Sequence, residues 1–142
     1  MDTLSNPILR VLEDYKAAVL AKDLEAFVAL YDQDVQVFDM WGVWVYRGIA
    51  AWREMAASWF SSLGSERVIV EFNSPHSIVT QDLAVIHVFV TFTAVTAEGA
   101  VLRSLDNRLT MTLKQRSGEW KVVHEHTSSP IDFETTKAIF QR

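Results

Sequence analysis

Residues 83–115 have the sequence LAVIHVFVTFTAVTAEGAVLRSLDNRLTMTLKQ, and this stretch decides the fold class. Apolar and more polar side chains alternate through most of it, and a period of two is typical of strands that bury one face. The pair Glu98-Gly99 near its centre is a two-residue hairpin signal. The stretch therefore predicts two long antiparallel strands, 83–96 and 101–115, joined by a tight turn.

The flanking sequence continues the same meander. Residues 66–72 already alternate, and Ser117-Gly118 predicts a second turn after the 101–115 strand. A last strand is expected over 120–128, followed by a tail, 132–140, that we expect to be helical.

The beginning of the chain predicts helices instead. Asn6 is a candidate N-cap in front of Pro7, and apolar residues then recur at helical spacing. Asp23 can cap a second, short helix, and a third is expected from after Gly48 to Gly64. Helices followed by a meander indicate an α+β fold, with three N-terminal helices packed on a curved antiparallel sheet.

Composition excludes several classes of protein. The 142 residues are 49% hydrophobic, which is enough for one domain, 1–142, with a substantial core. A net charge of -5 without a basic patch argues against a nucleic-acid partner. The chain has no cysteine, no signal-peptide pattern and no apolar run of membrane-spanning length, so we expect a cytoplasmic protein without disulfides.

Asp39 lies in the most aromatic stretch of the chain, VQVFDMWGVWVY at residues 35–46. A carboxylate among large apolar side chains loses hydration, which raises its pKa and makes it a useful base near neutral pH. The alternative interpretation is an exposed turn residue that closes a strand, 35–39, ahead of Gly42. The first interpretation makes Asp39 a candidate general base.

The two turns also predict which side chains share a face of the sheet. They place Thr91 opposite Asp106, and Thr110 opposite Glu125. One face then collects polar side chains: His87, Thr91, Asp106, Arg108, Thr110 and Glu125. This face either lines a pocket under the helices or faces water. A β-bulge in one of these strands would exchange the two faces for the residues that follow the bulge. If it lines the pocket, the aliphatic face must be buried elsewhere, which predicts a homodimer through the sheet.

The sequence His124-Glu125-His126 raises the possibility of a metal site, because residues two apart on a strand point the same way. The predicted pairing sends His87, Asp106 and Glu125 to the other face, so a third ligand is missing. We therefore expect no metal, and His124 and His126 to be packed inside the protein or at a subunit interface.

The order of elements resembles the nuclear transport factor 2-like (cystatin-like) superfamily, which includes ketosteroid isomerases, SnoaL-like polyketide cyclases and the association domain of calmodulin-dependent kinase II. Three segments carry the resemblance: YKAAVLAKDLEAFVALY at 15–31, the run into Asp39 followed by YRGI at 46–49, and GEWKVVHEHTS at 118–128. The resemblance covers nearly the whole chain and implies a cone-shaped fold. It is weakly specific for activity, because this pocket serves many tasks.

The resemblance to ketosteroid isomerases also implies roles for individual residues. Asp39 matches the general base, Tyr15 matches a tyrosine that donates a hydrogen bond to the enolate oxygen, and Asp106 matches a protonated aspartate that donates a second one. Arg108 departs from that pattern, because a guanidinium beside Asp106 would stabilise its ionised form. Arg108 suggests an acidic or strongly polar ligand instead.

These observations predict a pocket for a small molecule. Asp39, Tyr15 and Asp106 are the candidate catalytic residues, and the candidate substrate-binding residues are Trp41, Trp52, Trp59, His87, Arg108 and Glu125. The first hypothesis is a cofactor-independent isomerase, cyclase or lyase acting on a small carbonyl compound. The second is a non-catalytic ligand-binding or oligomerisation domain, and the third is a metal-dependent enzyme that uses His124 and His126.

Overall fold

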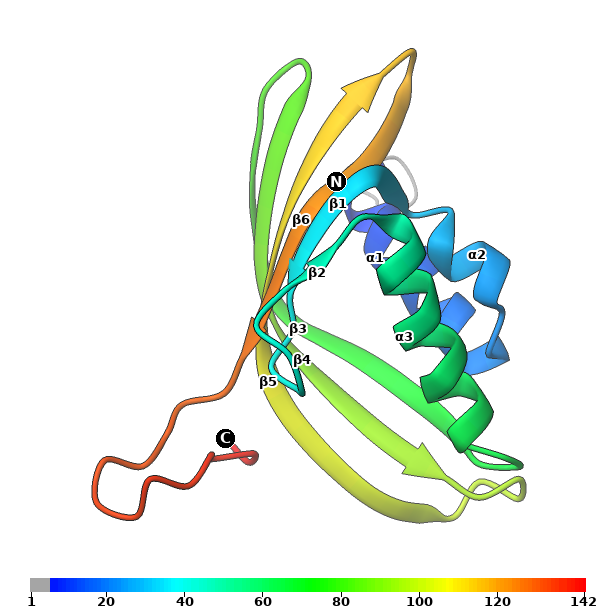
Figure 1. The fold of residues 1–142 in the computed structure, drawn as a ribbon, viewed down its shortest axis with the longest axis vertical. Coiled ribbons are helices and arrows are strands. Elements are labelled where there is room, and N and C mark those ends of the chain that lie inside the picture. The colour runs from blue at the N-terminus through cyan, green and yellow to red at the C-terminus, as the bar shows by residue number, and fades with distance from the viewer. Residues whose placement is uncertain (1–5) are drawn as a thin grey trace.

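Six strands form one curved sheet, and three helices lie against its concave face (Figure 1). The computed structural model describes residues 6–142. Along the chain the elements are α1 (Pro7–Ala21), α2 (Leu24–Val28), β1 (Tyr31–Phe38), β2 (Tyr46–Arg47), α3 (Ile49–Ser62), β3 (Arg67–Val79), β4 (Leu83–Val95), β5 (Val101–Arg116) and β6 (Glu119–Ser128). The α+β prediction is confirmed. The sheet, in the order β2-β1-β6-β5-β4-β3, is mixed rather than purely antiparallel, because β1 pairs with β6 in parallel.

The helices begin at the residues that the sequence indicates. The Asn6 side chain accepts hydrogen bonds from the backbone N of Ile8 and Leu9, at 2.9 and 3.3 Å, and so caps α1. Asp23 caps α2 in the same way, through the backbone N of Ala26 at 3.1 Å. Gly48 precedes α3 with a φ of +85°, a conformation that glycine adopts without strain. Among residues 6–142, no helix has both the length and the apolar composition needed to cross a membrane.

The pairing of β4 with β5 follows the prediction, with Thr91 opposite Asp106. The pairing of β5 with β6 starts as predicted at the Ser117-Gly118 turn but shifts by one residue between Thr112 and Leu113. Val123 of β6 has no partner on β5, so the strand has a β-bulge at this residue. Glu125 therefore pairs with Met111 instead of Thr110 and changes faces.

The aliphatic face of the sheet, and not the polar one, packs on the helices. Val90, Leu109 and Met111 are at most 2% exposed, whereas His87 and Arg108 on the opposite face are exposed. Of the two alternatives for the polar face, the one that places it under the helices was wrong. Burying aliphatic side chains is favourable by about 25 cal/mol per Å², while burying charged side chains carries a large desolvation penalty.

Aromatic rings join the helices to the sheet. The ring of Phe27, which is fully buried, lies 5.4 Å from Tyr15 and 5.3 Å from Tyr31, measured between centroids. Trp52 and Phe60 of α3 lie 6.2 and 5.7 Å from the same ring. Phe27 therefore fixes α1, β1 and α3 relative to one another.

Residues 129–142 form a turn and a returning segment, not the predicted helix. The Asp132 side chain accepts hydrogen bonds from the backbone N of Glu134 and Thr135, as a helix cap would, but Thr136 has a left-handed φ of +58° and the chain turns there instead of continuing as a helix. The segment leaves the body of the protein and comes back beside the sheet (Figure 1). Its end is attached to β5 by a hydrogen bond of 2.7 Å from the backbone N of Asp106 to the carbonyl O of Phe140.

Candidate active site

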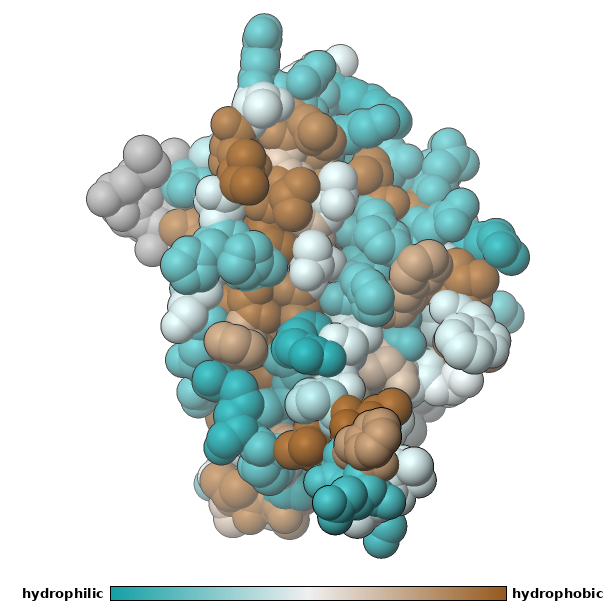
Figure 2. Space-filling model, turned by 90° about the vertical axis from the view of Figure 1, so that its left-hand side faces the viewer, coloured by the Kyte–Doolittle hydropathy of each residue, from teal (hydrophilic) through white to brown (hydrophobic). Residues whose placement is uncertain are grey.

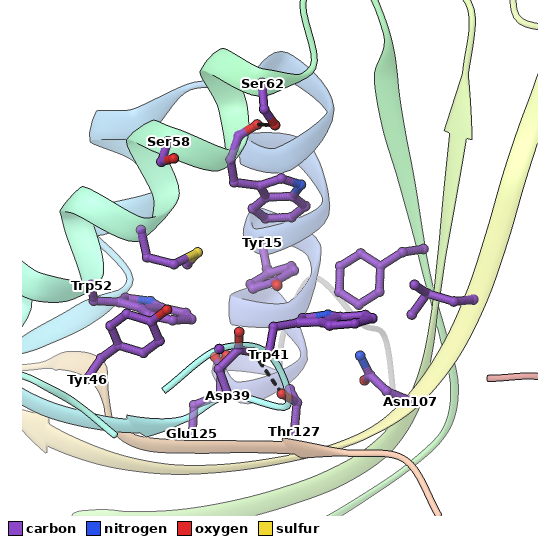
Figure 3. Close-up of a pocket in the computed structure, with 15 residues that line it drawn as sticks. Tyr15, Asp39, Trp41, Tyr46, Trp52, Ser58, Ser62, Asn107, Glu125 and Thr127 are labelled. Carbon is purple, nitrogen blue, oxygen red and sulfur yellow. Dashed lines mark hydrogen bonds between the residues drawn. The ribbon is translucent and has the colours of Figure 1, made fainter. Parts of the chain in front are cut away.

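A cavity of about 490 Å³ lies between α1, α3 and the concave face of the sheet (Figure 3). Its lining is mostly aromatic and aliphatic, with a few polar groups. The lining residues are Tyr15, Asp39, Trp41, Gly42, Tyr46, Trp52, Met55, Ser58, Trp59, Ser62, Phe92, Leu105, Asn107, Glu125 and Thr127. A concave apolar site with a few convergent polar groups is the usual form of a small-molecule site.

Asp39 follows the last residue of β1 and is half-buried at the base of this cavity (Figure 3). Burial raises the pKa of its carboxyl group above the ordinary value. The Thr127 hydroxyl opposes this shift by donating a hydrogen bond of 2.9 Å to Asp39 Oδ1. The same hydroxyl accepts from the backbone N of Met40, at 2.9 Å, so its proton points to the carboxylate.

Glu125 lies beside Asp39 and is only 1% exposed. Burial raises the pKa of Glu125 to about 8, although Tyr31 favours the ionised form by donating a hydrogen bond of 2.6 Å to Oε1. The charge of Asp39 raises it further. At neutral pH, Glu125 is therefore mostly a neutral carboxylic acid that can donate a proton or a hydrogen bond.

Tyr15 extends from α1 into the cavity, and its hydroxyl points toward the two acids (Figure 3). Burial raises the pKa of this phenol well above its usual value, and the nearby carboxyl groups of Glu125 and Asp39 raise it as well. The phenol therefore stays protonated as a hydrogen-bond donor. Its ring is fixed between Phe27, at 5.4 Å, and Phe72, at 5.8 Å.

Aromatic rings form the walls. Trp59 of α3 meets Phe92 of β4 edge to face, with centroids 6.1 Å apart, and Tyr46 lies 5.3 Å from Trp52. Trp41, which is 51% exposed, closes another side, whereas Trp44 is 95% exposed and does not line the cavity. Flat walls of this kind suit a flat ligand.

Asn107 lies on the same wall, with its amide directed at the cavity (Figure 3). Its Nδ2 donates to the sulfur of Met40 at 3.2 Å, while its buried Oδ1 has no hydrogen-bond partner among the described residues. Leaving a buried polar atom unpaired is unfavourable, so this amide is an incompletely satisfied polar group in the wall of the cavity.

The structure does not bring Asp106, Arg108 or His87 to the cavity. Asp106 lies on the outer face and accepts hydrogen bonds from Thr91 Oγ1, at 2.6 Å, and from the backbone N of Arg142, at 2.9 Å. The Thr91 bond, more than any other contact, lowers the pKa of Asp106. An ionised carboxylate on the outer face cannot donate a hydrogen bond to a ligand in the cavity, which corrects the role expected of Asp106.

The other two side chains on that face make contacts of their own. Arg108 donates from Nε to Ser128 Oγ at 3.0 Å, and the ring of His87 stacks on that of His76 at 5.3 Å. Neither side chain can bind a ligand in the cavity from this face, so the expectation that Arg108 binds an acidic or strongly polar ligand there was wrong.

His124 and His126 also point to the outer face, because they flank Glu125 on β6. His124 Nδ1 lies 2.7 Å from the carbonyl O of Gln36, and both rings meet Phe38 edge to face. Within residues 6–142, no three side chains of the types that bind metals lie close enough together to hold an ion.

Residues 8–132 match the SnoaL-like domain. The chain belongs to the SnoaL-like family. No curated protein matches the chain in sequence. Its fold is NTF2-like. A solved structure of an NTF2-like protein from Pseudomonas putida is 24% identical to this chain, and the two superpose with a TM-score of 0.83 over 100% of this chain and 98% of that one.

Two more distant structures share the fold of this SnoaL-like protein. Aln2 from a Streptomyces species is 17% identical, with a TM-score of 0.77 over 90% of this chain and 91% of that one. The association domain of C. elegans CaMKII is 21% identical, with a TM-score of 0.69 over 86% of this chain and 92% of that one. At these identities the likeness concerns the fold alone.

Several residues of the site were missed in the sequence, and three of them bear on its polar chemistry. Thr127 and Tyr31 bind the two acids, and Asn107 takes the place in the cavity that was expected of its neighbour Asp106. Once Glu125 is placed on the inner face, period-two alternation places Thr127 there too. Tyr31 carries no such signal, because its contact with Glu125 joins residues 94 positions apart.

Proposed function

We propose that this SnoaL-like protein is a cofactor-independent enzyme that transfers protons on a small, neutral carbonyl compound, with Asp39 as the general base. One observation carries the proposal: Asp39, neutral Glu125 and the Tyr15 phenol converge in one aromatic cavity. A base of raised pKa beside two protonated donors is the arrangement that enolisation requires.

The proposed step removes a proton from the carbon next to the carbonyl group. The Asp39 carboxylate takes this proton, the electrons of the C–H bond form a C=C bond, and the carbonyl π electrons move to oxygen. Tyr15 and the protonated Glu125 donate hydrogen bonds to the resulting enolate oxygen, which lowers the barrier. Asp39 then returns the proton to the same carbon or to another one, so that no cofactor is consumed.

The charges of the lining residues support a neutral ligand. None of the described residues around the cavity is a lysine, arginine or histidine, and two are carboxylic acids. An anionic ligand would find no counter-charge there and would meet the Asp39 carboxylate. With Arg108 on the outer face, the reason for expecting an acidic ligand disappears, and the aromatic walls favour a flat, neutral ketone or enone.

Deuterium exchange of a model ketone tests this proposal. The α-protons of 2-tetralone are replaced by deuterium in D₂O, and NMR follows the rate with and without the protein. We expect the wild-type protein to accelerate exchange, and Asp39→Asn to reduce the acceleration at least about 100-fold, as is typical for loss of a general base. Asp34→Asn, the same change at an exposed position on β1, is the matched control and should retain the wild-type rate.

Equal rates for Asp39→Asn and the wild-type protein would remove Asp39 from the mechanism. If the wild-type protein accelerated neither 2-tetralone nor 1-indanone exchange above the buffer rate, the proposed chemistry would be refuted for small aromatic ketones. Circular dichroism of each variant establishes that the fold is retained.

A non-catalytic role as an oligomerisation domain is the second candidate, and the outer face of the sheet favours it. Figure 2 shows a band of hydrophobic side chains along this face, flanked by hydrophilic ones. Ile78, Ile69 and Phe38 are 74%, 40% and 41% exposed, and strand alternation places them there. We propose that a second copy of the chain covers this face, as a homodimer through the sheet.

Sedimentation equilibrium tests the homodimer. We expect a dimer that Ile78→Glu weakens, while Val101→Glu at the β4–β5 hairpin, which is 70% exposed, leaves it intact. A monomeric wild-type protein would contradict this part of the proposal. A dimer that bound ketones without exchanging their protons would favour the non-catalytic role.

A further inference from the structure

The C-terminal segment reaches the loop that lines the cavity. The ring of Phe140 stacks on the indole of Trp41, with centroids 5.5 Å apart and planes inclined by 26°. Figure 1 shows the end of the chain returning beside the loop between β1 and β2, which contains Trp41. Trp41 also lines the cavity, whereas Phe140 does not, so the segment reaches the ligand site through this indole.

The segment is anchored to the outer face of β5 and β4 by several contacts. The carbonyl O of Phe140 accepts from the backbone N of Asp106 at 2.7 Å, and the Asp106 carboxylate accepts from the backbone N of Arg142 at 2.9 Å. Gln141 Nε2 donates to the carbonyl O of Ser104 at 2.8 Å, and the Arg142 guanidinium lies 4.2 Å from the ring centroid of Phe89. Contacts at Phe140 and at the two residues after it therefore hold its backbone in place.

Trp41 is less enclosed than other aromatic residues of the cavity. It lies in a loop without regular structure and is 51% exposed, whereas the cavity residues Trp52 and Tyr15 are 2% and 5% exposed and belong to helices. Among residues 6–142, one aromatic ring packs against this indole, and the orientation of Trp41 depends in part on that partner. Phe140 supplies this partner from the far end of the chain.

We propose that Phe140 is a positioning residue that holds Trp41 against the cavity and so sets the affinity for an aromatic ligand. Asp106 affects Trp41 indirectly, because it anchors the segment that carries Phe140. This inference rests on the proposed function only in requiring that the cavity binds a ligand, not that it catalyses a reaction.

The first test needs no ligand. Hydrogen–deuterium exchange followed by mass spectrometry reports the opening of the peptide that covers residues 39–46. We expect this peptide to exchange several-fold faster in Phe140→Ala than in the wild-type protein. Phe133→Ala, which removes another aromatic ring of the same segment at a position 97% exposed, is the matched control and should leave the rate unchanged. An unchanged rate in Phe140→Ala would overturn the positioning role.

The second test measures affinity for 2-naphthol, a neutral, flat phenol, by isothermal titration calorimetry. Loss of one aromatic stacking pair corresponds to about a two- to ten-fold weaker affinity, which we expect for Phe140→Ala. Phe140→Tyr keeps a ring in place and should restore the wild-type value. In a Trp41→Ala background, Phe140→Ala should have no further effect, because Phe140 acts through Trp41.

The outcomes separate this inference from the proposed function. Equal affinity in Phe140→Ala and the wild-type protein, or additive effects of the two alanine substitutions, would overturn the link from Phe140 to the ligand. If the wild-type protein did not bind 2-naphthol, the ligand half of the inference would fail for this class of compound, while hydrogen exchange would still decide the positioning role. If binding followed the predicted pattern but Asp39→Asn retained full exchange activity, only the proposed chemistry would fail.

Discussion

Replacing Glu125 by glutamine should make the protein more stable at neutral pH. Burial raises the pKa of Glu125 from its ordinary value of 4.5 to about 8. Unfolding restores the ordinary pKa, so between pH 4.5 and about 8 the chain releases a proton when it unfolds. The free energy of unfolding therefore falls as pH rises through this window and levels off above it.

The expected size of the effect follows from the shift. Each pH unit within the window lowers the wild-type free energy of unfolding by about 1.4 kcal/mol, which amounts to about 3 kcal/mol at pH 7. Glu125→Gln has nearly the same volume, keeps an oxygen that can accept from Tyr31, and cannot ionise. The variant and the wild-type protein should thus be similarly stable near pH 4.5, and the variant should be the more stable above it.

Urea unfolding at a series of pH values from about 4.5 to about 8.5, followed by circular dichroism, measures this divergence. Glu119→Gln, at an exposed position of the same strand, is the control and should follow the wild-type profile. A constant difference between Glu125→Gln and the wild-type protein across this pH range would refute the assignment of Glu125 as a buried neutral acid.

Three further substitutions test the supports of the site and the core. Tyr31→Phe removes the hydrogen bond that favours ionised Glu125, so the pKa of Glu125 should rise above that in the wild-type protein. A ¹³C-NMR titration that showed a lower pKa of Glu125 in the variant would contradict this role of Tyr31. Phe27→Ala should lower the free energy of unfolding by about 3–5 kcal/mol in urea, because the ring is fully buried, and a loss below about 1 kcal/mol would contradict its central place. Asn6→Ala should cost about 1 kcal/mol in the same assay through loss of the α1 cap, and an unchanged midpoint would count against the cap.

Local sequence signals predicted much of the fold and part of the site. The caps of α1 and α2, the long β4–β5 pairing and the acid that follows β1 are all encoded within short segments, and the structure contains each of them. Asp39 and Tyr15 were placed in one pocket by resemblance, and the structure brings both to the same cavity. Their catalytic roles stay a proposal.

The errors in the site came from two features that no local pattern specifies. The bulge at Val123 involves no glycine or proline, yet it moves Glu125 to the inner face and leaves His124 and His126 outside. The choice between the two faces of β5 depends on what the helices present to them. It is set by the packing of the whole domain and not by a local segment, and as a result Asn107 lines the cavity where Asp106 was expected.

The proposed chemistry depends on the Asp39 carboxylate being a base of raised pKa inside an aromatic cavity. The most direct measurement is a ¹³C-NMR titration of protein labelled at the aspartate carboxyl carbons, with the Asp39 signal assigned by its absence in Asp39→Asn. We expect the pKa of Asp39 to lie above its ordinary value of 3.8, because burial outweighs the hydrogen bond from Thr127. A pKa at or below 3.8 would show a solvated or strongly stabilised carboxylate and would contradict Asp39 as the base.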